Sequence, residues 1–249
     1  MIIIKNDKEI DLMRIAGRIV AETLLLVEKK VKPGITTAEL DRIAEEFITK
    51  HGAIPSFKGL YGFPASLCIS VNEQVVHGIP GGYVLKEGDI ISVDCGAHIN
   101  GFHGDAARTF AVGNISDEAK RLIQVTEESF FKGIEFAKPG NRLTDISHEI
   151  QRYVEASGFS VVRDFVGHGI GKSVHEDPEI PNFGRPGRGP KLVAGMTLAI
   201  EPMVNMGTYR VATLGDDWTV VSADKSLSAH YENTVVILPD GPEILTLIK

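Results

Sequence analysis

Residues 90–111, which read IISVDCGAHINGFHGDAARTFA, are the stretch around which we expect the fold to be organised. Asn100-Gly101 at the centre predicts a β-hairpin, because both residues accept the positive φ angles of a type I′ turn. A two-residue turn also fixes how the two strands pair, and it places Asp94 opposite Ala107.

The predicted hairpin presents two carboxylates on one face. Gly96 lies opposite Asp105, and side chains two residues apart on a strand share a face, so Asp94 and Asp105 become diagonal neighbours. We expect Gly96 to leave open space across from Asp105. The other face carries an apolar set that suits packing beneath helices: Ile91, Val93, Cys95 and Ala97.

Two carboxylates on a half-buried sheet repel each other and resist desolvation, so they need a proton, a cation or a metal ion between them. The alternative is a pair of solvated aspartates with Arg108 or His98 as their partner. The hairpin alone leaves both interpretations open.

Composition bounds the class of protein. The chain has 249 residues, 43% of them hydrophobic, which is enough for one large α/β domain or two small ones with a sizeable core. A net charge of −7 argues against nucleic-acid binding as the main function. Cys68 and Cys95 are the only cysteines and fit buried thiols in a reducing compartment.

The first ten residues lack the apolar core and cleavage pattern of a signal peptide, and no run is long enough to span a membrane. We therefore expect a cytoplasmic protein that binds neither DNA nor a membrane.

The chain before the hairpin predicts a helical pair. Residues 7–31 carry apolar side chains at three- and four-residue spacing, and Thr36 with Glu39 forms a capping-box pattern ahead of a second helix. We expect residues 53–64 to form an irregular surface. Residues 66–76 predict strand, turn and strand, which places His77 at a strand end.

The second half of the chain repeats this order. Residues 138–140 echo Lys32-Pro33-Gly34, and the helices that follow end at Gly158 and Gly52, with an offset of 106 residues in both cases. Asp94 and Glu201 each lie six residues after a glycine that precedes a strand. We predict one catalytic domain over residues 1–249, with an internal pseudo-repeat of roughly residues 7–111 and 116–238.

Packing of the halves about a pseudo-two-fold axis would bring Glu201 to Asp94 and Asp105. Glu232 lies in an otherwise apolar strand at residues 231–238, where an unpaired glutamate is unfavourable. For each glutamate, the alternative is a salt bridge to a lysine or arginine.

His168 and His175 lie in a segment, residues 167–178, whose glycines and proline disfavour a helix. An odd separation on extended chain sends two side chains to opposite sides, so we expect at most one of them to bind the same ion and the other to face substrate. A histidine beside glycines can also be an ordinary loop residue.

Four carboxylates and one imidazole exceed what one small divalent ion needs. Oxygen-rich ligation favours Mn, Co, Fe or Zn, and two ions bridged by carboxylates fit this set best. Such a pair can activate a shared water, so the predicted reaction class is metal-assisted hydrolysis.

Taken together, these motifs resemble the methionine aminopeptidase family over nearly the whole chain. More narrowly they resemble the type I bacterial form, because the catalytic motifs begin early and no long insertion separates His175 from Glu201. The motifs that carry the resemblance are His77-Gly-Ile-Pro, Asp94, Gly101-Phe-His-Gly-Asp105, Gly167-His-Gly-Ile-Gly, His175-Glu-Asp-Pro, Glu201-Pro-Met and Tyr231-Glu232.

The resemblance implies an α/β (α+β) pita-bread fold, with two pseudo-symmetric halves and a central antiparallel sheet covered by helices. It implies two divalent ions per chain, Co, Mn, Fe or Zn, with Asp105 and Glu232 bridging them, Asp94 completing one site, and His168 with Glu201 completing the other. A water bridging the ions would attack the scissile carbonyl, and Glu201 would act as general acid and base.

By the same resemblance, His77 and His175 position the substrate and help to stabilise the tetrahedral intermediate. The methionine pocket maps onto Phe63, Cys68, His77, Val174 and Trp218, an apolar lining that suits a thioether side chain. The alternative for Trp218 is a core aromatic.

The chain departs from the family pattern at a few positions. Val174 replaces a bulky aromatic that relatives often carry, and Leu60 and Phe63 stand where relatives often have tyrosine, which changes the expected pocket width. Gly96 replaces a threonine, so a hydrogen bond to the metal ligands is missing or is supplied by water.

The expected activity is removal of the initiator methionine from nascent polypeptides whose second residue is small and uncharged. Nascent N-termini are the expected partner, the ribosome exit region is a second candidate, and we expect a monomer. The alternatives are a proline-directed aminopeptidase or dipeptidase of the same fold, and a non-catalytic relative that binds ribosomes or RNA.

Overall fold

The computed structural model describes residues 1–248, and it combines four long helices with short antiparallel strands. The helices are α1 (Asp7–Glu28), α2 (Thr37–Lys50), α3 (Asp117–Ile134) and α4 (Leu143–Ala156), with one 3₁₀ turn at Leu60–Gly62. The strands are β1 (Ile54–Pro55), β2 (Leu67–Val71), β3 (Gln74–Val76), β4 (Ile90–Ile99), β5 (Phe102–Ala111), β6 (Ser160–Val161), β7 (Gly167–Gly169), β8 (Glu176–Ile180), β9 (Thr197–Ile200), β10 (Met203–Asn205), β11 (Val211–Thr213), β12 (Val220–Ser222), β13 (Ser228–His230), β14 (Asn233–Leu238) and β15 (Gly241–Ile244).

The predicted hairpin is confirmed residue for residue. β4 and β5 pair antiparallel with Asp94 opposite Ala107 and Gly96 opposite Asp105. The turn residues Asn100 and Gly101 have φ angles of 53° and 82°, which a β-branched residue would not tolerate. The two strands of the hairpin are the longest in the molecule among the residues that the structure describes.

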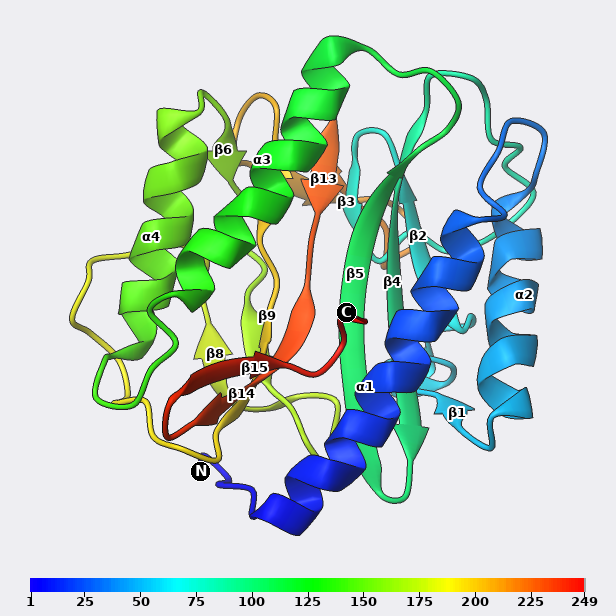
Figure 1. The fold of residues 1–249 in the computed structure, drawn as a ribbon. Helices are drawn as coiled ribbons and strands as arrows, with labels where there is room; N and C mark the ends of the chain where they lie inside the picture. Colours follow the sequence, from blue (N-terminus) through cyan, green and yellow to red (C-terminus); the bar gives the residue numbers. More distant parts are fainter. Residues whose placement is uncertain (249) are drawn as a thin grey trace.

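The strands form four small antiparallel sheets. β1, β4, β2 and β5 form one sheet, and β15, β14, β9, β7 and β8 form another in that order. The remaining two are β13-β10-β6 and β11-β12-β3. In Figure 1, the pair α1 and α2 covers the hairpin half, and the pair α3 and α4 covers the other half, which matches the predicted mixed α/β fold.

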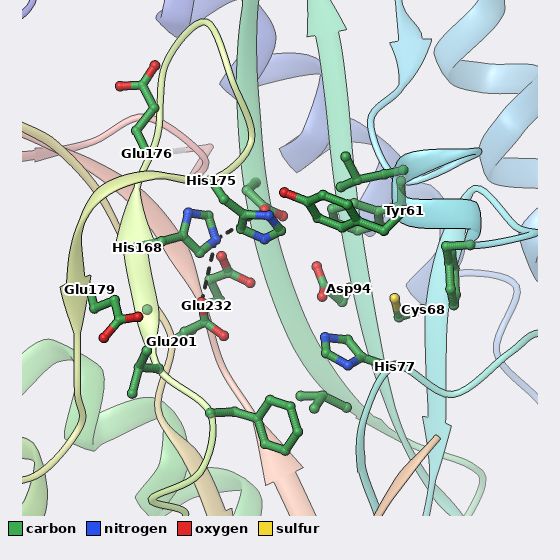
Figure 2. A pocket seen from close by; sticks show the side chains of 18 of the residues that line it. Tyr61, Cys68, His77, Asp94, His168, His175, Glu176, Glu179, Glu201 and Glu232 are labelled. Carbon is green, nitrogen blue, oxygen red and sulfur yellow. Dashed lines mark ion pairs between the residues drawn. The ribbon is translucent and has the colours of Figure 1, made fainter. Parts of the chain in front are cut away.

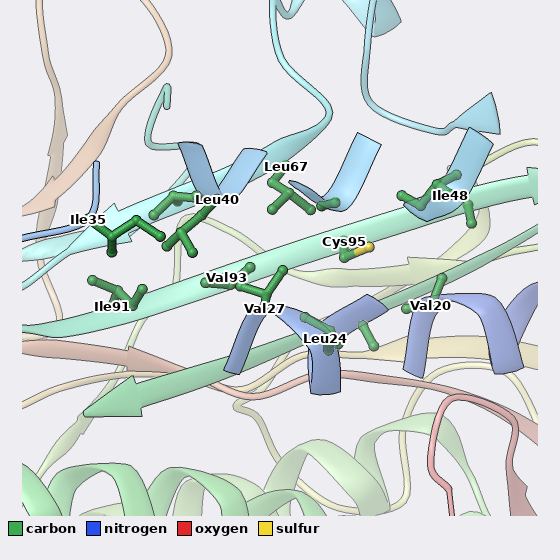
Figure 3. Close-up of a cluster of buried hydrophobic side chains, with 14 of the residues drawn as sticks. Val20, Leu24, Val27, Ile35, Leu40, Ile48, Leu67, Ile91, Val93 and Cys95 are labelled. Carbon is green, nitrogen blue, oxygen red and sulfur yellow. The ribbon is translucent and has the colours of Figure 1, made fainter. Parts of the chain in front are cut away.

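The apolar face of β4 is buried beneath the first helical pair, as predicted. Ile91, Val93 and Cys95 are fully buried against Val20 and Leu24 of α1 and against side chains of α2 (Figure 3). A second cluster joins Phe130 of α3 and helix α4 to β9 and β14. Each helical pair therefore has its own core, and the strands lie between the two cores.

Half of the capping-box pattern at the second helix is confirmed, because the Thr36 side chain accepts a hydrogen bond from the Glu39 amide, whereas the reciprocal hydrogen bond to the Glu39 side chain is not formed in the described structure. The same local geometry recurs in the second half. Thr36 pairs with Val84 in an isolated bridge, and Arg142 pairs with Lys191 in a second one. These matched contacts support the pseudo-repeat, which stays a prediction.

Two sequence predictions about local structure are wrong. Residues 53–64 are irregular, but they do not lie only at the protein surface, because the side chains of Phe57 and Phe63 are only 7% and 3% exposed. Gly96 does not leave open space, since a Cβ there would lie 2.7 Å from the Cβ of Ser56 and 2.9 Å from the Phe57 ring. The turn after β1 fills the space that the hairpin pattern left vacant.

Helix α1 reaches the hairpin through a close backbone contact. A Cβ at Gly104 would lie 2.8 Å from the backbone nitrogen of Gly17, and a Cβ at Gly17 would lie 2.3 Å from the carbonyl oxygen of Leu245. Neither glycine has a positive φ angle. Glycine is therefore needed at both positions for the close approach of the neighbouring backbone and not for its own backbone conformation. This contact sets the depth of α1 on the strand that carries Asp105.

Gly104→Ala should therefore destabilise the protein by about 1 to 3 kcal/mol through overpacking. The midpoint of thermal unfolding should fall by about 2 to 4 °C for each kcal/mol in a chain of this size. Gly215→Ala is the matched control, because nothing lies within 4 Å of a Cβ at Gly215. Equal unfolding midpoints for the two variants would contradict the packing argument.

Candidate metal and substrate site

Four acidic side chains from both halves of the chain meet between the two sheets. Asp94 and Asp105 lie on β4 and β5 as the diagonal neighbours predicted. Glu201 directly follows β9, and Glu232 directly precedes β14, so both glutamates lie at strand ends rather than within strands. Paired backbone hydrogen bonds between Ala107 and Glu232, of 3.0 and 3.3 Å, join the halves beside the cluster.

Side chains of Thr234 and Arg108 also form hydrogen bonds to the backbone at Asp105 and Glu232. The Thr234 hydroxyl accepts a hydrogen bond from the Asp105 amide at 3.0 Å and donates one to the Asp105 carbonyl at 2.9 Å. The buried Arg108 guanidinium donates to the Glu232 carbonyl at 2.5 Å and to the Asn233 side chain at 2.7 Å. Arg108 therefore binds backbone and amide oxygens rather than neutralising the aspartates, and the salt-bridge alternative does not describe this site.

His168 on β7 faces the acids. Its Nε2 lies 3.6 Å from Glu201 Oε1 and 3.8 Å from Asp105 Oδ2 (Figure 2). Its Nδ1 lies 2.9 Å from the Gly169 carbonyl oxygen and must donate in that hydrogen bond, which leaves the Nε2 lone pair directed at the cluster. Burial lowers the pKa of His168 to about 4, so the ring is neutral at physiological pH.

The argument that His168 and His175 point to opposite sides is wrong. The segment between them turns back instead of running extended, and the two rings meet edge to face with centroids 4.5 Å apart. Both rings line one cavity (Figure 2). His175 is absent from the groups of side chains whose ligand atoms converge, among the residues described, whereas His168 belongs to one with Asp105 and Glu232.

His230 is a site residue that the sequence analysis missed. It is 2% exposed, and its Nε2 lies 3.8 Å from Glu232 Oε2 and 3.9 Å from Glu201 Oε2. Burial lowers its pKa to about 3, so this ring is neutral too. The signal was its place two residues before Glu232, since alternate side chains on an extended chain share a face.

Burial dominates the electrostatics of the acids. It raises the pKa of Asp94 to about 7. Burial and then the charges of Glu232 and Asp94 raise the pKa of Asp105 well above its usual range. Burial and then neighbouring carboxylates also raise the pKa values of Glu201 and Glu232 well above the ordinary value. Four such groups cannot all be charged here without a compensating cation.

The donor set fits divalent metal ions. Asp94 Oδ1, Asp105 Oδ1, Glu232 Oε1 and His230 Nε2 are buried without a hydrogen-bond partner among the described residues. Ligand atoms that share one ion at about 2.1 Å lie about 3 to 4 Å apart, which is the spacing of the His168 contacts. The unpaired oxygens and neutral imidazoles are therefore what such an ion would need.

The acids form the floor of a cavity of about 560 Å³ with an apolar wall. Phe63, Cys68 and Trp218 line that wall, and the Phe63 and Trp218 rings meet edge to face at 5.1 Å. His77 also lines the cavity, at the end of β3 as predicted, and burial lowers its pKa. Val174 does not reach the cavity surface but packs behind it, 4% exposed.

Comparison with known proteins gives consistent matches along the whole chain. The model of metallopeptidase family M24 matches residues 11–239. The methionine aminopeptidase of Clostridium perfringens is 79% identical over 249 residues, with 100% of each chain covered. Methionine aminopeptidase 1 of Bacillus subtilis is 60% identical over 248 residues, again with 100% of each chain covered.

Solved structures agree with these matches. The methionine aminopeptidase of Thermotoga maritima superimposes with a TM-score of 0.98 at 49% identity, covering 100% of both chains. The prolidase of Pyrococcus furiosus has a TM-score of 0.82 at 23% identity, and this chain covers 66% of its length. The prolidase likeness shows the shared fold alone.

The raised pKa of Asp94 predicts how the metal-free protein responds to pH. Its pKa of about 7 exceeds the unfolded value of 3.8, so the stability it contributes is lost as pH rises from about 4 to about 7. Asp94→Asn should remove this loss. Since one pKa unit corresponds to about 1.4 kcal/mol, the gain at pH 8 should reach up to about 4 kcal/mol and raise the unfolding midpoint of the metal-free protein.

Thermal melts of chelator-treated protein at pH 5.5 and pH 8 check this expectation. The gain of Asp94→Asn over the parent chain should be larger at pH 8, and the variant should gain less stability on adding Mn²⁺. A metal-free variant that is less stable than the parent at pH 8 would contradict the account of the acidic cluster.

Proposed function

The chain belongs to metallopeptidase family M24 and is similar in sequence and fold to bacterial methionine aminopeptidases, and we propose that it removes the initiator methionine from new polypeptides. The expected substrates carry a small, uncharged second residue. The observation that carries the proposal is the cluster of four buried carboxylates, with unpaired oxygens, beneath a cavity that has an apolar wall.

We assign two divalent ions to five side chains. Asp94, Asp105, His168, Glu201 and Glu232 would hold these ions. Bound ions of this kind lower the pKa of a shared water molecule and polarise the scissile carbonyl. Mn, Co, Fe and Zn all suit this mixture of carboxylate and imidazole ligands.

Glu201 is the proposed general acid and base. It lies at the edge of the acidic cluster, with Oε1 3.6 Å from His168 and Oε2 3.9 Å from His230. From this place it takes a proton from the attacking water and gives it to the leaving amine. Burial raises the pKa of Glu201, which suits a carboxyl group that first accepts a proton and then donates it.

His77 and His175 both line the cavity, where they orient the substrate and help to stabilise the tetrahedral intermediate. Burial lowers the pKa of each, so each imidazole is neutral and donates one N–H to the substrate or to the developing oxyanion. His175 also packs between the His168 ring and the exposed Tyr61 ring at the mouth.

The methionine side chain occupies the apolar wall. Phe63, Cys68 and Trp218 contact its thioether, and Val174 supports Phe63 and Cys68 from behind. Burial and nearby carboxylates raise the pKa of Cys68 well above its usual range, so this thiol stays neutral and acts as an apolar contact. A side chain at the second substrate position would face the crowded histidines and acids, which favours small residues.

The proposed setting is the cytoplasm, where a monomer meets nascent N-termini, with the ribosome exit region as a candidate contact. No helix within residues 1–248 has the length and apolar character needed to cross a bilayer.

Methionine release from Met-Ala-Ser tests the proposal. Protein stripped of metal should be inactive, and its activity should recover on titration with Mn²⁺ or Co²⁺. It should release little methionine from Met-Leu-Ser and should not cleave an Ala-Pro peptide. Cleavage confined to the Ala-Pro peptide would indicate a proline-directed enzyme, and bound metal without cleavage of any peptide would favour a binding protein.

Asp105→Ala should abolish both metal binding and methionine release, because Asp105 is 3% exposed and lies at the centre of the acidic cluster. Isothermal titration with Mn²⁺ and the Met-Ala-Ser assay measure the two losses. Asp240→Ala, which removes a carboxylate from the exposed turn between β14 and β15, is the control and should alter neither property. Full activity of Asp105→Ala would overturn the assignment.

A further inference from the structure

Residues 1–6, which precede α1, lie against the turn that leads into β9. The Lys5 amide donates a hydrogen bond to the Gly195 carbonyl at 2.8 Å. A Cβ at Gly195 would lie 2.6 Å from the carbonyl oxygen of Lys5, so the two backbones are in close contact. This placement carries the Lys5 side chain toward the loop between β7 and β8, which holds His175.

Lys5 forms a buried ion pair with Glu176, the first residue of β8, which directly follows that loop. Nζ lies 2.5 Å from Oε2, and the two side chains are 3% and 6% exposed. Every other pairing of a lysine or arginine with a carboxylate side chain in the described part of the chain leaves its cation at least 38% exposed. Loss of one partner would leave an unpaired charge in a dry environment.

The Glu176 carboxylate also closes the loop on itself. Oε1 accepts hydrogen bonds from the amides of Lys172 at 2.8 Å and Ser173 at 3.3 Å. A Cβ at Gly171 would lie 2.5 Å from Cε of Lys5, so the loop wraps directly around the lysine. The ammonium group thus lies beside both Gly171 and the Glu176 carboxylate, where the chain returns to the cavity.

His175 immediately precedes Glu176, and the two side chains take opposite directions. Figure 2 shows Glu176 directed away from the acidic cluster and His175 directed toward it. The backbone at Glu176 is fixed by the ion pair and the two amide hydrogen bonds, so the direction of the His175 ring is fixed with it.

We propose that Lys5 is a positioning residue for His175, acting through the Glu176 carboxylate. Its ammonium group holds the Glu176 carboxylate where it accepts hydrogen bonds from the loop amides, and the closed loop presents the His175 ring to the substrate. The inference deepens the proposed function, because it assigns part of the substrate-orienting machinery to the segment that precedes the first helix.

Lys5→Met keeps the length and the apolar stem of the side chain but removes its charge. We expect kcat/KM for Met-Ala-Ser to fall about tenfold or more, since small displacements of an orienting group have effects of this size. The Mn²⁺ affinity should stay within about twofold of the parent chain. Glu176→Gln should give a smaller loss, because the amide oxygen still accepts from the loop amides.

Lys172→Met is the matched control. Lys172 joins the same loop to Glu9 of α1 by an exposed contact of 3.5 Å, with side chains 68% and 24% exposed. Such surface pairs contribute little, and this variant should keep the parent kcat/KM.

The sharper test places Lys5→Met in a His175→Gln background. If Lys5 acts through His175, it should cause less than a twofold further loss of kcat/KM there. Histidine-labelled NMR spectra give a second readout that needs no catalysis: Lys5→Met should shift the His175 ring resonances and leave those of the distant, exposed His51 unchanged.

Equal losses in the two backgrounds, or an unshifted His175 resonance in Lys5→Met, would overturn the inference. If the parent chain releases no methionine from any peptide, the proposed function fails, and the NMR comparison still decides whether Lys5 positions His175.

Discussion

Repulsion among four buried carboxylates is the constraint on which this structure depends. Asp105 and Glu232 are almost inaccessible to water. The His168 and His230 rings beside them are neutral, so neither ring compensates the charge of the carboxylates. Protons can relieve the repulsion, as the raised pKa values show, but protonated acids leave oxygens without partners. Divalent ions satisfy both the charge and the unpaired oxygens, which is why the cluster is better understood as a binding site than as a stabilising element.

The fold imposes this proximity through its backbone. Asp94 and Asp105 are held by strand pairing in the hairpin, and Glu232 is held by its hydrogen bonds to Ala107 and Arg108. Side chains fixed in this way cannot move apart to reduce their repulsion. The helical pairs supply the apolar burial that compensates for the unfavourable cluster, and the close contact of Gly17 with Gly104 shows how tightly helix and hairpin are packed.

Local signals predicted much of this arrangement. Asn100-Gly101 and strand alternation placed Asp94 beside Asp105, and the repeated glycine spacing indicated that Glu201 belongs with them. The errors arose where distant segments meet. The space at Gly96 is filled by the turn at Phe57, and the His175 ring returns to His168 because its loop folds around Lys5. No periodicity within a strand or helix records such contacts. His230 differs, because its alternation with Glu232 was a local signal that was not used.

The contact between Arg108 and Glu232 spans 124 positions in the sequence, and this separation has a consequence for the order of folding. The hairpin can form early from local contacts, but its acids remain hydrated until the last strands arrive, because closing so long a loop is slow. During synthesis the chain therefore cannot capture its ions with the native ligand set until it is nearly complete. An ion that binds only the folded state opposes unfolding by mass action. The free energy of unfolding of the finished chain therefore rises with the concentration of available metal.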